Sequence, residues 1–188
     1  MKTTVSKIIP FIFIVFLTFF LNGCIVFHKV SYVVNLDTPN SGIATVTAYD
    51  MRSNAGTNKD FNEDKTNLFQ YMLKSKEFVV QQKMQGKDIT SRKLYVEDDK
   101  LIGVGTYKFG NVGAVEGIKY QGGFHYLNLA LSDSVMDTNG EIIRSNDYKR
   151  IMWDSTFKTL KFTMFSFSFE HNNSRSLAPY YKQGKGSK

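Results

Sequence analysis

Apolar residues alternate with polar or small residues along most of this chain, and this two-residue period constrains the fold more than any other feature. Residues 30–36 and 43–49 both show it, and a turn cluster at residues 38–42 separates them. Successive side chains of a β-strand point to opposite sides, so each segment predicts a strand and the pair predicts a hairpin. Further strands are expected at residues 78–80, 94–96, 101–109, 124–131, 148–153 and 157–169.

One segment instead shows the spacing of an amphipathic helix. Asp60, followed three residues later by Glu63, resembles a capping pair, and an apolar stripe with helical spacing follows it. We therefore expect a single helix at residues 62–76. Together with the strands, it predicts an α+β fold in which a mainly antiparallel sheet of about seven or eight strands packs on one amphipathic helix. The stripe consists of Leu68, Phe69, Met72 and Leu73.

The N-terminal segment is a short apolar run behind two lysines. Lys2 and Lys7 flank its start, residues 8–21 are almost entirely apolar, and no acidic residue precedes Cys24. As a helix, this run would span about 21 Å, which is less than the ~30 Å hydrocarbon core of a bilayer. The segment is therefore typical of a cleaved signal peptide rather than of a retained transmembrane helix.

The residues that end this run, Leu21-Asn22-Gly23-Cys24, resemble the lipobox of bacterial lipoproteins. The resemblance implies cleavage between Gly23 and Cys24, and it implies diacylglycerol and a fatty acid on Cys24, the only cysteine of the chain. These lipids would anchor the protein to a membrane. Ile25, in place of an aspartate after the cysteine, implies the periplasmic face of the outer membrane if the cell is Gram-negative. We expect no cofactor beyond the covalent lipids.

Removal of residues 1–23 would leave 165 residues, a size that suits one domain. We expect this domain at residues 24–170 and a basic, disordered tail at residues 171–188. The formal net charge would fall from +7 to +5 because two lysines leave with the signal peptide. The remaining charges are mixed along the chain, which is typical of a solvated surface. An envelope location also separates the protein from nucleic acid, so no nucleic-acid partner is expected.

Residues that could carry out chemistry are sparse. His28, His125 and His171 are isolated, and none lies at metal-ligand spacing with another histidine or carboxylate, so no metal site is expected. The sequence contains no nucleophile elbow, phosphate loop or metalloprotease helix, and a lipidated Cys24 cannot act as a nucleophile. We therefore predict no catalytic residues and no enzymatic activity. His125 alternates with leucines, which is typical of a hydrogen-bonded histidine at the edge of a core.

Phenylalanines crowd the last predicted strand. Phe165, Phe167 and Phe169 share one face of it. One interpretation is that this face belongs to the core and lies under the helix. The other interpretation is an exposed apolar groove that binds a ligand or a partner.

Three functions follow from these features. The first is a non-catalytic envelope lipoprotein that acts as a binding or assembly module for another envelope protein. The second is a carrier of lipid or another apolar ligand that uses the phenylalanine-rich strand. The third is a hydrolase without a recognised motif. The mature part, with its strands, one capped helix and residues 151–153, is similar to small uncharacterised envelope lipoproteins, a resemblance that implies no catalytic residue.

Overall fold

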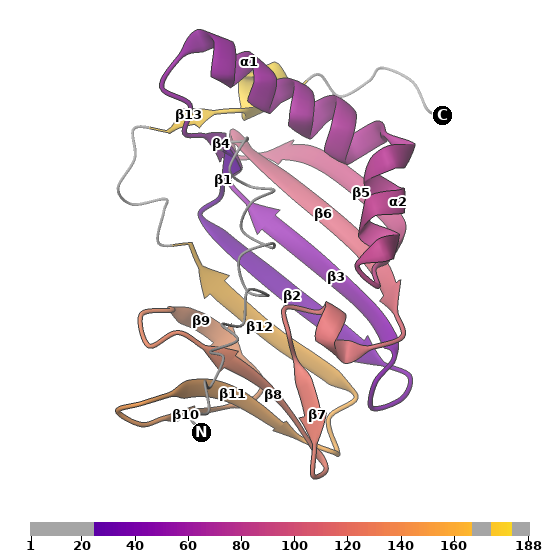
Figure 1. Ribbon diagram of the computed structural model, residues 1–188. Helices are drawn as coiled ribbons and strands as arrows, with labels where there is room; N and C mark the ends of the chain where they lie inside the picture. The colour runs from indigo at the N-terminus through magenta and orange to yellow at the C-terminus, as the bar shows by residue number, and fades with distance from the viewer. Residues whose placement is uncertain (1–24, 167–173, 182–188) are drawn as a thin grey trace, which may run out of the picture.

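The computed structural model describes residues 25–166 and 174–181. These residues form three antiparallel sheets and a helical layer, so the fold is broadly α+β (Figure 1). The prediction of one sheet and one helix is too simple, because the described residues contain two α-helices and divide their strands among three sheets.

The largest sheet has six strands in the order β5-β6-β3-β2-β12-β9. The predicted hairpin is present, with Leu36 of β2 opposite Gly42 of β3. A second hairpin joins β5 to β6 through Asp98 and Asp99, whose φ values of 48° and 58° give the turn that two-residue hairpins favour. The strands are β2 (Lys29–Leu36), β3 (Gly42–Tyr49), β5 (Asp88–Glu97), β6 (Lys100–Phe109), β9 (Val135–Thr138) and β12 (Thr159–Phe165).

Two smaller sheets complete the β structure. One has the order β10-β11-β8-β7, and the other has the order β1-β4-β13. The four-stranded sheet contains β7 (Lys119–Gln121), β8 (Phe124–Leu129), β10 (Glu141–Arg144) and β11 (Lys149–Asp154). The three-stranded sheet contains β1 (Ile25–Val26), β4 (Arg52–Ser53) and β13 (Arg175–Ser176).

The four-stranded sheet packs against one end of the large sheet and forms the main core with it. Trp153 and Ile151 from β11 are buried together with Leu160 and Phe162 from β12. The Phe162 ring stacks on Tyr32 with a centroid distance of 4.5 Å. Burial of large aromatic side chains contributes strongly to stability, so this end of the fold is densely packed.

The core face of β12 is not the face predicted from its phenylalanines. Leu160 and Phe162 are buried in the core and Met164 packs against it, whereas Phe165 lies on the opposite face. Phe165 is half-buried and contacts the His28 ring edge-on at 5.0 Å. A two-residue period fixes which residues share a face but not which face is buried, so the interpretation that places Phe165 in the core is wrong.

A helical layer covers the other end of the same sheet face (Figure 1). The predicted helix is present but begins earlier, because Thr57 rather than Asp60 caps it by accepting a hydrogen bond from the Asp60 N–H at 3.2 Å. The strand predicted at residues 78–80 is wrong, because Ser75 caps a second helix there by accepting from the Phe78 N–H. The layer consists of α1 (Asn58–Thr66), the π-helical segment η1 (Asn67–Met72) and α2 (Lys76–Met84).

The expected disordered tail is partly wrong. Residues 174–181 are described, and β13 within them pairs with β4. Leu177 is fully buried beneath α1 and η1, and the short 3-10 helix η4 (Ala178–Tyr180) follows it. An apolar leucine within the basic segment explains why this part joins the fold. No described helix is long and apolar enough to cross a membrane.

Candidate functional site

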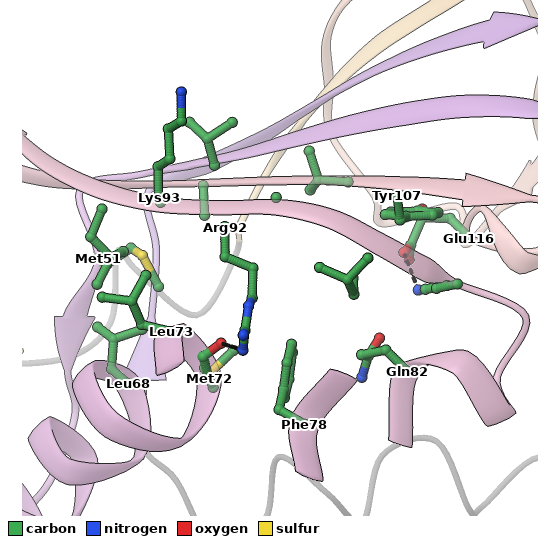
Figure 2. A pocket seen from close by; sticks show the side chains of 18 residues that line it. Met51, Leu68, Met72, Leu73, Phe78, Gln82, Arg92, Lys93, Tyr107 and Glu116 are labelled. Atoms are coloured by element: carbon green, nitrogen blue, oxygen red, sulfur yellow. Dashed lines mark hydrogen bonds and ion pairs between the residues drawn. The ribbon is translucent and has the colours of Figure 1, made fainter. Parts of the chain in front are cut away.

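A pocket lies between the helical layer and the large sheet. Its volume is about 290 Å³, close to the lower limit of roughly 300 Å³ for small-molecule sites. Strands β3, β5 and β6 form its floor, while η1 and α2 form its roof (Figure 2). The pocket therefore occupies the sheet face that continues from the main core.

The floor of the pocket is hollow because β6 lacks side chains there. Gly103 and Gly105 lie two residues apart on β6, so both are on the same face of the sheet. They pair with Ala48 and Val46 of β3, respectively. A Cβ atom at Gly103 would meet Met51 Sδ at 2.7 Å, whereas a Cβ atom at Gly105 would meet no heavy atom within 4 Å. The empty space therefore lies directly over Gly105.

The walls of the pocket are mainly apolar and come from separate parts of the chain. The π-helical segment supplies Leu68 and Met72, and α2 supplies Phe78. A π-helical turn contains an extra residue, which changes the direction of the side chains after it, and such turns are frequent at functional sites. The remaining large apolar side chains of the wall are Met51, Leu73, Ile89 and Leu94.

Arg92 is a charged side chain within this apolar wall. Figure 2 shows it reaching from β5 toward the helical segment. Its Nη1 donates hydrogen bonds to the backbone carbonyls of Met72 at 2.8 Å and Ser75 at 3.1 Å. The guanidinium carbon lies 5.8 Å from the centre of the Phe78 ring. Arg92 therefore holds the end of the π-helical segment against the sheet while remaining at the pocket.

A second polar group closes the other end of the pocket. Lys87 Nζ lies 3.9 Å from Glu116 Oε1 and 5.5 Å from the centre of the Tyr107 ring. The Tyr107 hydroxyl is buried and has no hydrogen-bond partner among the described residues. An unsatisfied buried hydroxyl costs about 1–3 kcal/mol, so a ligand that accepts this hydrogen bond would gain affinity.

Burial controls the ionisation of two tyrosines beside Glu116. Desolvation by burial, followed by the charge of Glu116, raises the pKa of Tyr107 well above its ordinary value. The pKa of Tyr32 is raised for the same two reasons in the same order, with smaller contributions from Tyr107 and from a hydrogen bond with Glu116. Both phenols therefore stay neutral at physiological pH and act as hydrogen-bonding groups rather than anions.

None of the site residues predicted from sequence that the structure describes lines this pocket. Phe165 does not line it, and Gly23, Cys24, Phe167 and Phe169 lie outside the described residues. His125 is buried, and its Nε2 contacts the Pro39 carbonyl oxygen at 2.7 Å rather than a carboxylate. This contact fits the expected histidine at the edge of a core.

The sequence contained one usable signal for the pocket. Two glycines separated by a single residue within a strand, as at Gly103 and Gly105, leave a bare strip on one face. Arg92 carried no comparable signal, because its role depends on contacts with helical carbonyls distant in sequence. Within the described residues, no group of three or more histidine, cysteine or acidic side chains is arranged to hold a metal ion.

Comparisons with protein families, curated proteins and solved structures find no match to this chain. The geometry of the pocket and the sequence features at the N-terminus are therefore what indicate a function for this chain.

Proposed function

We propose that this protein is a membrane-anchored envelope lipoprotein that binds a small apolar or amphipathic ligand in the pocket beneath α2. The open space over Gly105 is the observation that carries the proposal. Protein interiors are ordinarily close-packed, and a glycine with no neighbour within reach leaves apolar walls without contacts. A ligand would supply those contacts.

The position of the pocket agrees with a lipid anchor at Cys24. Ile25, the next residue, belongs to β1 and packs against the apolar cluster that contains Met51. Met51 also lines the pocket. Lipids on Cys24 would therefore hold the ligand site close to the membrane, where apolar ligands are concentrated.

Photoreactive ten-carbon ligands test the binding function. The full chain would be reconstituted in phosphatidylcholine vesicles and exposed to diazirine analogues of decanol and decanoic acid. We expect saturable labelling of at least one kind in peptides that contain η1, α2 or β6. Gly105→Val should reduce this labelling at least tenfold, because its side chain would occupy the empty space.

The matched control is Gly110→Ala. Gly110 also has open space around it, but it does not line the pocket. This variant should be labelled like wild type. Equal labelling of Gly105→Val and wild type would reject the pocket as the ligand site.

The anchor has its own test. Metabolic labelling with a fatty acid should mark the wild-type protein, and Cys24→Ser should abolish the label. Normal processing and salt-resistant membrane association of Cys24→Ser would reject the lipobox interpretation.

A different surface supports the assembly module as a second candidate. On the outer face of the four-stranded sheet, Arg150 lies 5.3 Å from the Tyr126 ring and 4.6 Å from the Tyr148 ring. Phe124 shares that face and is 42% exposed. Tyrosine and arginine are enriched at the energetic centres of protein interfaces. Crosslinking in intact cells should recover an envelope protein from wild type but not from Tyr148→Ala if this surface binds a partner.

A further inference from the structure

Arg92 brings a positive charge to a pocket whose walls are otherwise mainly apolar. Its side chain is half-buried and lies between the floor and the roof of the pocket. Only Nη1 is engaged by the carbonyls of Met72 and Ser75. Guanidinium carries five N–H donors, so Arg92 retains donors for another acceptor.

The charges around the pocket are unbalanced. Glu116 is the one carboxylate among the lining residues, and it lies beside Lys87 at 3.9 Å. No carboxylate of the described residues forms an ion pair with Arg92. Lys93 also lines the pocket, but Figure 2 shows its ammonium group pointing away. Arg92 is therefore a partly desolvated cation without a negative partner of its own, an arrangement that favours an anionic ligand.

We infer that the pocket takes a single-chain anionic amphiphile, whose carboxylate or phosphate head accepts hydrogen bonds from Arg92 and whose apolar chain lies over Gly105. This inference rests on the proposed ligand-binding function. A guanidinium matches carboxylate and phosphate oxygens through paired hydrogen bonds. The volume of about 290 Å³ is at the lower limit for ligand sites, so it suits one chain rather than a two-chain lipid.

A series of ligands with the same chain and different heads tests the inference on the wild-type protein. Diazirine analogues of decanoic acid, decyl phosphate, decanol and decylamine would be titrated against the full chain in phosphatidylcholine vesicles, with protein-free vesicles as the blank. Hydrogen bonds to charged groups contribute about 1.5–3 kcal/mol. We expect half-saturation by an anionic ligand at a concentration roughly 10- to 100-fold lower than by decanol, and the weakest labelling by decylamine.

The outcomes separate the inference from the proposed function. Equal half-saturation by decanol and both anions would overturn the anionic head while leaving an apolar site. No saturable labelling by any of the four would reject the site itself. Preference for decanoic acid over decyl phosphate, or the reverse, would identify the head group.

Variants at two adjacent residues locate the head. Arg92→Met should abolish the preference for the anionic ligands over decanol, while decanol labelling remains saturable even if loss of the Arg92 contacts with the roof shifts its half-saturation. Lys93→Met removes a charge of the same sign from the neighbouring residue and should change neither. Retained decanol labelling shows that the pocket of Arg92→Met is still folded. Undiminished preference for anions in Arg92→Met would overturn the role of Arg92, and an equal loss in Lys93→Met would indicate a general charge effect instead.

Discussion

The two ends of one sheet face differ in how they are covered. At one end, the four-stranded sheet contributes Trp153 and Ile151, which fill the space over Phe162 and Leu160. At the other end, helices cover the strands but leave a pocket of about 290 Å³. Both ends belong to the same six strands, so the strand backbone does not determine packing density. The side chains that the strands present determine it.

Strand β6 shows this difference along its own length. Tyr107 and Phe109 are buried in the main core, whereas Gly103 and Gly105 on the same face border the pocket. These four residues occupy every second position of one strand and therefore share a face. The change from large side chains to none marks the boundary between the two regions. If this comparison is correct, substitutions at the two ends should have different costs.

The largest expected loss of stability comes from a substitution on the core face of β12, and the same substitution on the opposite face should cost less. Phe162→Ala should lower the free energy of unfolding by about 3–5 kcal/mol, because it removes a fully buried ring from the dense end. Phe165→Ala, the same change on the opposite face, should cost less than half as much because that ring is only half-buried. Urea denaturation of both variants measures the difference. Equal losses would contradict the assignment of faces.

The next effect concerns the helical end. Leu177→Ala should cost about 2–4 kcal/mol, because the side chain is fully buried under α1 and η1. Leu131→Ala provides the control, since Leu131 is 43% exposed and a surface change should stay within about 0.5 kcal/mol. If Leu177→Ala unfolds at the same urea concentration as wild type, the C-terminal segment does not stabilise the helical layer.

Alanine substitutions at one glycine in each region compare their packing directly. A Cβ atom at Gly140 would lie 2.6 Å from Trp153 Nε1 and 2.8 Å from Ile151 Cγ2. Gly140→Ala should therefore cost about 1–3 kcal/mol through overpacking. Gly105→Ala should be neutral or stabilise by up to about 1 kcal/mol, because the space is open and alanine restricts the unfolded chain. A comparable loss in both variants would show that the pocket end is as tightly packed as the core.

Much of the strand content could be predicted from local sequence patterns. The alternation at residues 30–36 and 43–49 identified β2 and β3, and the turn between them fixed their pairing. Local patterns did not predict which strands pair when the partners are distant in sequence. Consecutive strands β9 and β10 join different sheets, although the run Asp137-Thr138-Asn139-Gly140, which spans the end of β9 and the connection to β10, favours a turn. Pairing with partners distant in sequence leaves no local trace.

The helical layer and the pocket show two further limits. Phe78, Val79 and Val80 favour a strand by propensity, but the Ser75 cap and packing on β5 make them helical. Gly103 and Gly105 indicate two strand positions without side chains, but nothing in the sequence specifies what lies above them. The pocket appears only when helices from another part of the chain are placed over these glycines.

The smallest expected effect depends on pH and tests the polar end of the pocket. Burial and the charge of Glu116 raise the pKa of Tyr107 in the folded protein. A tyrosine of the unfolded chain has a pKa of about 10. The folded state therefore binds more protons than the unfolded state above that pH. Stability is fully present below pH ~10 and falls as the pH rises toward the folded pKa, by at most about 1.4 kcal/mol per pH unit for each such tyrosine.

Tyr107→Phe removes one of these groups and should weaken the loss of stability between pH 9 and pH 11 by about 1 kcal/mol. Near neutral pH, Tyr107→Phe should lose at most about 1 kcal/mol of unfolding free energy relative to wild type. The hydroxyl that it removes has no hydrogen-bond partner among the described residues. Tyr120→Phe, a change at the exposed edge strand β7, is the control for alkaline effects elsewhere. Urea denaturation at several pH values measures all three proteins. Parallel pH profiles for wild type and Tyr107→Phe would show that the Tyr107 phenol is not desolvated, and the polar end of the pocket would then be as open to water as the outer surface.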